Sequence, residues 1–138
     1  MSGKSQFYPN ARHLFATGAL SWTVGNYKCL IMASGYSPNF ATDTYLSDVP
    51  APAIIATSPT ITGIGESLGY LTGDTIPFGV ISSALIAGSL IFFKDTGVPS
   101  SSPLIVYVDT PDVAGFPQAL TGFNYYVYKN LVGGWFRL

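Results

Sequence analysis

The sequence reads GSLIFFKDTGVPSSSPLIVYVD over residues 88–109, and this stretch carries its clearest structural signal. It contains two apolar runs, 88–94 and 103–109, which are rich in β-branched and aromatic residues and have the length of strands. Asp95-Thr96-Gly97 stands between them. Turns use such residues, because Asp accepts hydrogen bonds from nearby backbone amides and Gly can take a positive φ. The stretch therefore predicts two strands with a turn between them.

The Asp-Thr-Gly triplet is also the catalytic signature of aspartic proteases. Those enzymes need two Asp carboxylates that face each other and share a proton, so a chain this short would have to dimerise. Lys94 before the triplet and Val98-Pro99 after it depart from the retroviral-type pattern. The apolar-apolar-Gly segment expected well downstream has a counterpart in Leu131-Val132-Gly133, which stands too near for that fold. The turn is the favoured interpretation.

Strand-like runs continue on both sides of this stretch, and Gly, Pro, Ser and Asp interrupt them at short intervals. This pattern is typical of an antiparallel sheet protein. We expect one domain over residues 1–138, mainly β, an antiparallel sandwich or barrel with one or two short helices. The other candidate strands are residues 27–33, 52–57, 65–72, 74–80, 123–129 and 134–138.

Helical signals are few. Asn10 can cap a short helix near the N-terminus, in which Ala11, Leu14 and Phe15 repeat at helical spacing, and Gly18 can end it. Residues 40–50 are ambiguous between a strand and a single helical turn. Thr42 or Asp43 could cap that turn and Pro50 would stop it.

The composition is poor in charge. Asp, Glu, Lys and Arg make up 9% of the 138 residues and the net charge is −1, whereas Phe, Tyr and Trp reach 14%. Ordinary soluble domains carry about 25% charged residues. Protein interfaces are depleted in Lys, Glu and Asp and enriched in aromatic residues. The composition therefore favours a chain whose surface is largely covered by neighbouring proteins over a neutral β protein with a Ser/Thr/Asn surface.

No membrane or export signal is evident. The N-terminus lacks the apolar region of a secretory signal. Residues 75–93 are uncharged and long enough to span a bilayer, but Pro77, Gly79 and Ser82-Ser83 fit a strand, a polar turn and a second strand better. We expect no membrane association.

Residues with catalytic or metal-binding chemistry are sparse. His13 is the only histidine and Cys29 the only cysteine, and Cys29 is expected to be a small buried hydrophobe. Asp95, Asp109 and Asp112 flank strand ends and could meet around a hard cation, although no EF-hand spacing supports this. We therefore expect no catalytic residue, no cofactor and no dedicated metal site.

Two further segments are disfavoured as ligand sites. GIGESLGY at 63–70 has glycines but no lysine after them and no strand-to-helix context, so it is not a phosphate loop. FNYYVY at 123–128 has aromatic residues but too few basic neighbours to bind a nucleic-acid strand. Its alternation predicts a strand with Phe123, Tyr125 and Val127 on a core face and Asn124, Tyr126 and Tyr128 outside.

Five segments occur in an informative order: YPNARHLFATGALSW (8–22), YKCLIMASGYSPNFATDTYLSDVP (27–50), IIATSPTITG (54–63), GSLIFFKDTG (88–97) and PLIVYVDT (103–110). Together they resemble a family of small tailed-bacteriophage virion proteins. The positions that match the motifs of that family are Tyr8, Asn10, Ala11, Arg12, Phe15, Gly18, Leu20, Trp22, Ser34, Gly35, Tyr36, Pro38, Leu46, Ser47, Asp48, Pro50, Ala56, Thr57, Ser58, Lys94, Asp95, Thr96 and Gly97. The resemblance implies a virion component and supplies no catalytic residue.

The hypothesis that follows is a capsid decoration (cement) protein on the outer surface of the major capsid lattice, made in the host cytoplasm. Its partners would be the major capsid protein and copies of itself, in a homo-oligomer such as a trimer. A neck, tail or fibre-base protein is the alternative, and a small-ligand binder or hydrolase is a distant one. The candidate interface residues are Tyr8, Tyr36, Tyr45, Tyr126, Tyr128 and Trp135. An Arg12–Asp48 ion pair at the edge of the core and strand addition through residues 134–138 are further expectations.

Overall fold

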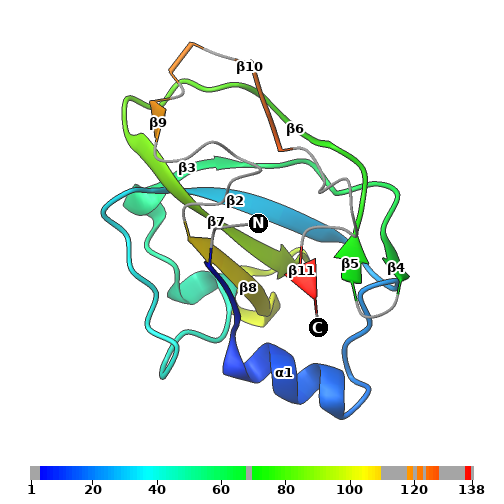
Figure 1. Ribbon diagram of the computed structural model, residues 1–138. Coiled ribbons are helices and arrows are strands. Elements are labelled where there is room, and N and C mark those ends of the chain that lie inside the picture. Colours follow the sequence, from blue (N-terminus) through cyan, green and yellow to red (C-terminus); the bar gives the residue numbers. More distant parts are fainter. Residues whose placement is uncertain are drawn as a thin grey trace.

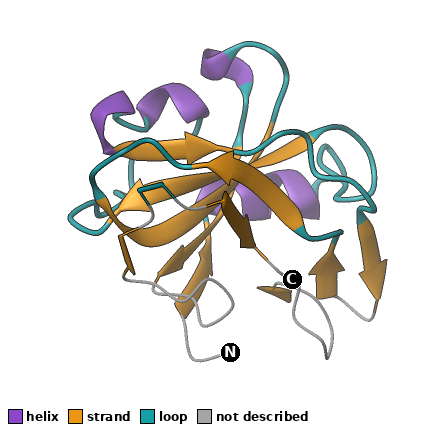
Figure 2. Ribbon diagram, turned by 90° about the horizontal axis from the view of Figure 1, so that it is seen from above, coloured by secondary structure: helices purple, strands orange, loops and turns teal. Residues whose placement is uncertain are grey.

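The computed structural model describes residues 4–67, 70–109, 118–119, 121–122, 124–127 and 136–137. It shows a mainly β protein with antiparallel sheets and one α-helix (Figure 1). The arrangement is sandwich-like: the short helical turns lie on one side of the large sheet and the short strands lie on the other (Figure 2). The predicted fold class is therefore confirmed.

The large sheet has six strands. Five of them follow the spatial order β1, β8, β7, β2 and β3, and β9 pairs with the first two residues of β7, before the part of β7 that β8 pairs with. All of these pairings are antiparallel. The bounds are β1 Lys4–Phe7, β2 Tyr27–Ala33, β3 Ile54–Thr57, β7 Ile86–Lys94, β8 Leu104–Asp109 and β9 Gln118–Ala119.

Two small sheets complete the β structure. One pairs β6 with β10, and the other places β5 between β4 and β11. Their strands are β4 Gly65–Ser67, β5 Tyr70–Thr72, β6 Ile76–Val80, β10 Asn124–Val127 and β11 Phe136–Arg137.

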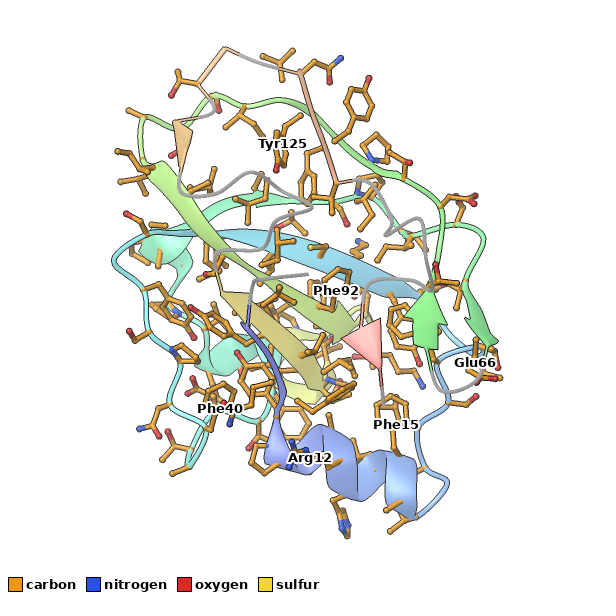
Figure 3. The ribbon with its side chains drawn as sticks, in the orientation of Figure 1. Arg12, Phe15, Phe40, Glu66, Phe92 and Tyr125 are labelled. Atoms are coloured by element: carbon orange, nitrogen blue, oxygen red, sulfur yellow. The ribbon has the colours of Figure 1, made fainter. Side chains whose placement is uncertain are left out.

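The central strands β2 and β7 are buried on both faces of the large sheet, which is why their sequences read as nearly continuous apolar runs rather than as alternating ones. Partners across the strands share a face. Cys29, Phe92 and Val106 form one such row, with Phe92 near the middle of the molecule (Figure 3). Leu30 and Ile91 belong to the opposite face, together with Tyr107 of β8.

Different segments cover these two faces. On the Cys29 side lies Tyr125 of β10, whose ring also packs against Phe78 of β6, with 6.2 Å between ring centroids. On the opposite side Phe40 packs edge-on against Tyr107 at 6.1 Å. The core is thus formed between the large sheet and the segments that flank it, and it is aromatic on both sides.

Helix α1, Pro9–Ala16, begins two residues earlier than a cap at Asn10 would require. Tyr8 occupies the N-cap position with extended backbone and without a side-chain cap, and Pro9 is the first helical residue, a position that proline favours. The expectation of an Asn10 cap is therefore wrong. The expected end is confirmed, because Gly18 has φ +78° and its N–H donates to the Phe15 carbonyl.

The ambiguous segment 40–50 contains a short 3₁₀ turn, η1 (Leu46–Asp48), and not a turn capped by Thr42 or Asp43. The Asp48 carboxylate holds its start by accepting hydrogen bonds from the Thr44 and Tyr45 amides at 2.9 and 3.0 Å. Two more 3₁₀ turns are η2 Ala51–Ala53 and η3 Pro99–Ser101.

The strand predictions succeed in the apolar runs and fail at the edges of the fold. The prediction for 27–33 matches β2 residue for residue. Residues 65–72 were expected as one strand, but Gly65–Ser67 and Tyr70–Thr72 pair with each other as β4 and β5. Strand β1 was not predicted at all. Neither was β9.

None of the helices in the described ranges has both the length and the apolar character needed to cross a membrane.

Candidate functional site

The Asp95-Thr96-Gly97 triplet forms a turn beyond the end of β7. Gly97 has φ +87°, and its N–H donates to Asp95 Oδ1 at 2.9 Å. The other carboxylate oxygen lies 3.0 Å from Lys28 Nζ of β2. The Gly97 hydrogen bond, and then Lys28, lower the pKa of Asp95 below its usual value. The turn interpretation is confirmed, and both oxygens of this carboxylate serve the fold.

Hydroxyl groups complete the same turn. Thr96 Oγ1 lies 2.7 Å from Ser101 Oγ and 3.1 Å from Ser102 Oγ. The Val98 carbonyl accepts hydrogen bonds from all three hydroxyls. Because these groups satisfy one another, the cluster fixes the loop between β7 and β8 and leaves no hydroxyl activated by a neighbouring base.

The single cysteine and the single histidine do not form a nucleophilic pair. Cys29 is completely buried in β2, and burial raises the pKa of its thiol well above the usual value. His13 is exposed on α1. The expectation that Cys29 is a buried hydrophobe is confirmed.

The sequence offers Asp95, Asp109 and Asp112 as residues that could meet around a cation, and the structure gives each of them a different outcome. Asp95 contacts Lys28 and Gly97, Asp109 is the last residue of β8, and Asp112 lies outside the described residues. The part of the chain that the structure describes contains no cluster of three or more His, Cys, Asp or Glu side chains suited to a metal ion.

An aromatic cluster covers the Tyr107 side of the sheet. Tyr8 packs on Phe40 with ring centroids 5.1 Å apart, and Tyr36 packs on Tyr107 at 6.4 Å. The Tyr36 hydroxyl donates to the Asp43 carboxylate at 3.5 Å, and burial, followed by the Asp43 charge, raises the pKa of Tyr36 to about 12.

Tyr8 was expected as an exposed interface residue, and this expectation is wrong. Its side chain is fully buried in the aromatic cluster. Burial, with smaller contributions from Tyr36 and Asp43, raises its pKa. The hydroxyl lies near that of Tyr36, yet it has no hydrogen-bond partner of good geometry among the described residues. Tyr8 stands between Phe7 and Pro9 in the segment QFYPN, and no periodic pattern there predicts which of these side chains is buried.

The expected Arg12–Asp48 ion pair is not formed. Asp48 instead accepts the Thr44 and Tyr45 amides, which lower its pKa. Arg12 is exposed on α1, at the lower edge of the molecule in Figure 3. A salt bridge joins Lys28 and Asp95 instead. The alternative of a solvated surface arginine fits this geometry.

The other interface candidates have mixed outcomes. Tyr45 and Tyr126 each expose 38% of their surface, and Tyr36 is half-buried. Strand β10 shows the predicted alternation over its described residues, with Tyr125 and Val127 inward. Tyr128 and Trp135 lie outside the described residues. The prediction that residues 134–138 add a strand to a neighbouring protein is weakened, because Phe136–Arg137 already pairs with β5 of the same chain.

Exposed apolar residues lie near the two ends of β7, and of these only Tyr45 was among the predicted interface candidates. We call Val80, Leu85 and Ile86 the β7-start group: Val80 is the last residue of β6, Leu85 lies in the connection, and Ile86 is the first residue of β7. We call Val24, Tyr45 and Val98 the β7-end group. Five of these six side chains are aliphatic: Val24, Leu85 and Val98 lie in turns, and Val80 and Ile86 are the end residues of strands.

Backbone contacts show where the three residues of the β7-end group lie in the fold. The Asp95 amide, just past β7, donates to the Asn26 carbonyl, two residues after Val24. Val98 follows in the same turn and directly precedes η3. Tyr45 directly precedes η1, which packs against η3, and Tyr45 forms a β-bridge with Pro103. The three residues therefore share the end of the sheet at which β7 finishes.

No model of a known protein family matches this chain, and a comparison with curated proteins likewise finds no match.

Proposed function

We propose that the chain is a structural protein of a bacteriophage virion, and more specifically a capsid decoration protein that binds the outer surface of the major capsid lattice. The five sequence segments that resemble small tailed-phage virion proteins support the virion role. Three of them contain structural landmarks of this fold: β2, β7 with its Asp95-Thr96-Gly97 turn, and helix α1.

The observation that carries the decoration role is the surface. Large apolar side chains are exposed at both ends of β7 in a chain with 9% charged residues. Scattered exposed hydrophobes are ordinary, but groups of them mark protein contacts. Such a surface binds a partner by burying apolar area, which suits a protein that lies against the outer surface of a capsid lattice.

The chemistry of the described residues suits a structural role. The Asp95 carboxylate, the Thr96, Ser101 and Ser102 hydroxyls and the Asp48 carboxylate are each bound within their own turns. The Cys29 thiol is buried. These groups hold loops in place, and a structural protein needs nothing more from them.

In this proposal the major capsid protein and further copies of the chain are the partners, with a homo-oligomer such as a trimer on the capsid, and no nucleic acid or membrane is bound. Aromatic and aliphatic side chains would provide the anchors, as they do in other protein interfaces. Tyr45 and Tyr126 are the exposed aromatic candidates among the described residues.

The test is to add the purified chain to empty capsids that lack it and to image the particles by electron cryomicroscopy. We expect regular extra density on the outer capsid surface and co-sedimentation with the particles. Density confined to the neck, tail or fibre base of complete virions, with bare capsid faces, would favour the other structural role. Absence of the chain from purified virions would overturn the proposal.

A further inference from the structure

The aromatic cluster on the Tyr107 side of the large sheet is a closed circuit of four rings. The Phe40 ring packs against both Tyr8 and Tyr107, with ring centroids 5.1 and 6.1 Å apart. Tyr36 packs on Tyr107 at 6.4 Å, and its hydroxyl lies near that of Tyr8. The Tyr8 amide donates to the Ile105 carbonyl, so Tyr8 is fixed to β8 as Tyr107 is. We call Tyr8, Tyr36 and Tyr107 the Phe40 socket, because Phe40 fills the space among them.

The loop segment that carries Phe40 is held together by hydrogen bonds of its own. The Asn39 carbonyl accepts the Thr42 and Asp43 amides at 3.1 and 2.8 Å. The Asp43 carboxylate accepts the Asn39 amide at 2.9 Å. The side chains around Phe40 in this segment are mostly exposed, and Phe40 itself is half-buried. Because these hydrogen bonds lie within the segment, the turn keeps its shape when Phe40 leaves the socket.

The Tyr8 hydroxyl is the group in the socket that Phe40 cannot satisfy. Tyr8 is completely buried, and its hydroxyl has no well-placed partner among the described residues. A buried hydroxyl left unpaired costs free energy. A phenylalanine ring offers no hydrogen-bonding atom to this hydroxyl, whereas a ring of the same size with a hydroxyl group of its own does. Phe40 therefore fills the volume of the socket and leaves its hydrogen bonding incomplete.

We propose that the Phe40 socket is a binding site for an uncharged phenolic ring, which displaces Phe40 and pairs its hydroxyl group with that of Tyr8. The size of the ligand follows from Phe40, the ring that the socket already holds. The Asp43 carboxylate accepts the Tyr36 hydroxyl at 3.5 Å, and its negative charge beside the socket disfavours an anionic ring. The segment that carries Phe40 acts as the lid of this site. The site goes beyond the proposed decoration function, and its test needs no capsid.

The experiment uses two probes, p-cresol, which corresponds to a tyrosine side chain, and toluene, which corresponds to a phenylalanine side chain. Phe40→Ala empties the socket and keeps its three tyrosines. Titration calorimetry should show that this variant binds p-cresol at least about tenfold more tightly than the wild type, because Phe40 no longer competes. Phe78→Ala is the matched control, since it removes a ring of the same size that packs on Tyr125, on the other face of the sheet. It should bind p-cresol no more tightly than the wild type does.

The pairing with Tyr8 is tested by comparing the two probes. The dissociation constant of toluene is divided by that of p-cresol, first in Phe40→Ala and then in the double variant Phe40→Ala/Tyr8→Phe. This ratio should fall about tenfold when Tyr8 loses its hydroxyl, because p-cresol then loses its hydrogen-bond partner and toluene loses nothing. An unchanged ratio would show that the socket accepts any ring of this size, which overturns the proposal.

The wild type decides whether the site belongs to the natural chain, and it does so even if Phe40→Ala fails to fold. Nuclear Overhauser effects from p-cresol to the rings of Tyr8 and Tyr107 should appear as p-cresol is added, and those between Phe40 and Tyr107 should weaken. If they do not, the socket is closed to ligands and the proposal fails, whereas the decoration function is unaffected.

The same measurement with N-acetyl-tyrosinamide separates the two sources of a phenolic ring. Contacts from both probes would assign the socket to a tyrosine side chain of a peptide. Contacts from p-cresol alone would assign it to a small free phenol. Both results support the site, and contacts from neither probe overturn it.

Discussion

Lys28 Nζ of β2 lies 3.0 Å from Asp95 Oδ2, just beyond the end of β7, and this contact joins two neighbouring strands of the large sheet to the turn between β7 and β8. The second oxygen of the same carboxylate accepts the Gly97 amide. One side chain therefore makes two different contributions, an ion pair with Lys28 and a charge-assisted hydrogen bond from the Gly97 amide within its turn. These contributions can be separated by substitution.

Asp95→Asn should cost little and Asp95→Ala clearly more. Asn retains an oxygen for the Gly97 amide, although that hydrogen bond is weaker without the charge, and it loses the Lys28 contact, which in a partly exposed pair contributes about 0.5 kcal/mol. Ala loses the amide hydrogen bond as well, which adds about 1 kcal/mol. Chemical denaturation of the two variants at neutral pH measures both values. Equal costs would show that the charge contact, and not the turn hydrogen bond, is the main contribution.

The pH dependence of the Asp95 contribution follows from the lowered pKa of Asp95. A carboxyl whose folded pKa is below its unfolded value, about 3.9, stabilises the fold above that value and loses the contribution as pH falls through the folded pKa. The difference in unfolding free energy between wild type and Asp95→Asn should thus be constant near neutral pH and shrink below about pH 4. A difference that grew on acidification would contradict the lowered pKa.

Tyr8→Phe and Tyr27→Phe form a matched pair of hydroxyl deletions. The Tyr8 hydroxyl is buried without a well-placed partner, so its removal should be neutral or stabilising. The Tyr27 hydroxyl donates to the Ser21 and Val24 carbonyls, and its removal should cost about 1 kcal/mol. Thermal and denaturant unfolding of both variants provide the comparison. A larger cost for Tyr8→Phe than for Tyr27→Phe would show that the Tyr8 hydroxyl is bound in solution.

Gly88→Ala should destabilise the fold, and Gly35→Ala should not. A Cβ on Gly88 would stand 2.5 Å from the Ser34 Cα, which is backbone and cannot move aside without disturbing β2. Overpacking of this kind costs about 1–3 kcal/mol. Gly35 has no atom within 4 Å of its added Cβ, so the same chemical change there should be within about 0.5 kcal/mol of the wild type. Equal unfolding free energies for the two variants would contradict the close approach.

Local sequence patterns were enough to predict those strands and turns that depend on residues close together in the sequence. The run of residues 27–33 is apolar and bounded by turn residues, and it forms β2 with those bounds. Asp95-Thr96-Gly97 forms the turn that its side chains favour. The alternation in β10 is that of a half-buried strand. In each case the signal and its structural consequence lie within a few residues of each other.

Long-range packing could not be predicted in this way. Lys28 and Asp95 are far apart in sequence, and only the antiparallel register of β2 and β7 brings them together. Tyr8 is buried because Phe40 and Tyr36 come from a different loop, which no pattern around Tyr8 indicates. Strand β1 was missed because a short edge strand depends on the neighbour that it pairs with, here β8.

Binding to capsids should survive high salt. The chain has six basic and seven acidic residues, and Lys28 and Asp95 already pair within the fold, so few charges are left for an interface. Raising the salt from about 0.15 M to about 1 M shortens the screening length from about 8 Å to about 3 Å, which weakens surface ion pairs but not apolar burial. Co-sedimentation with empty capsids across this range measures the effect.

The expected salt titration is flat to within about threefold, and Arg12→Ala, which removes an exposed charge on α1, should leave it unchanged. A variant with Val80→Thr, Leu85→Ser and Ile86→Thr should give weak binding at every salt concentration, because these substitutions remove exposed apolar area rather than charge. A loss of wild-type binding of more than about tenfold by 1 M salt would mean that charge pairs hold the contact. In that case the exposed apolar groups at the ends of β7 would not be what holds the protein on the capsid.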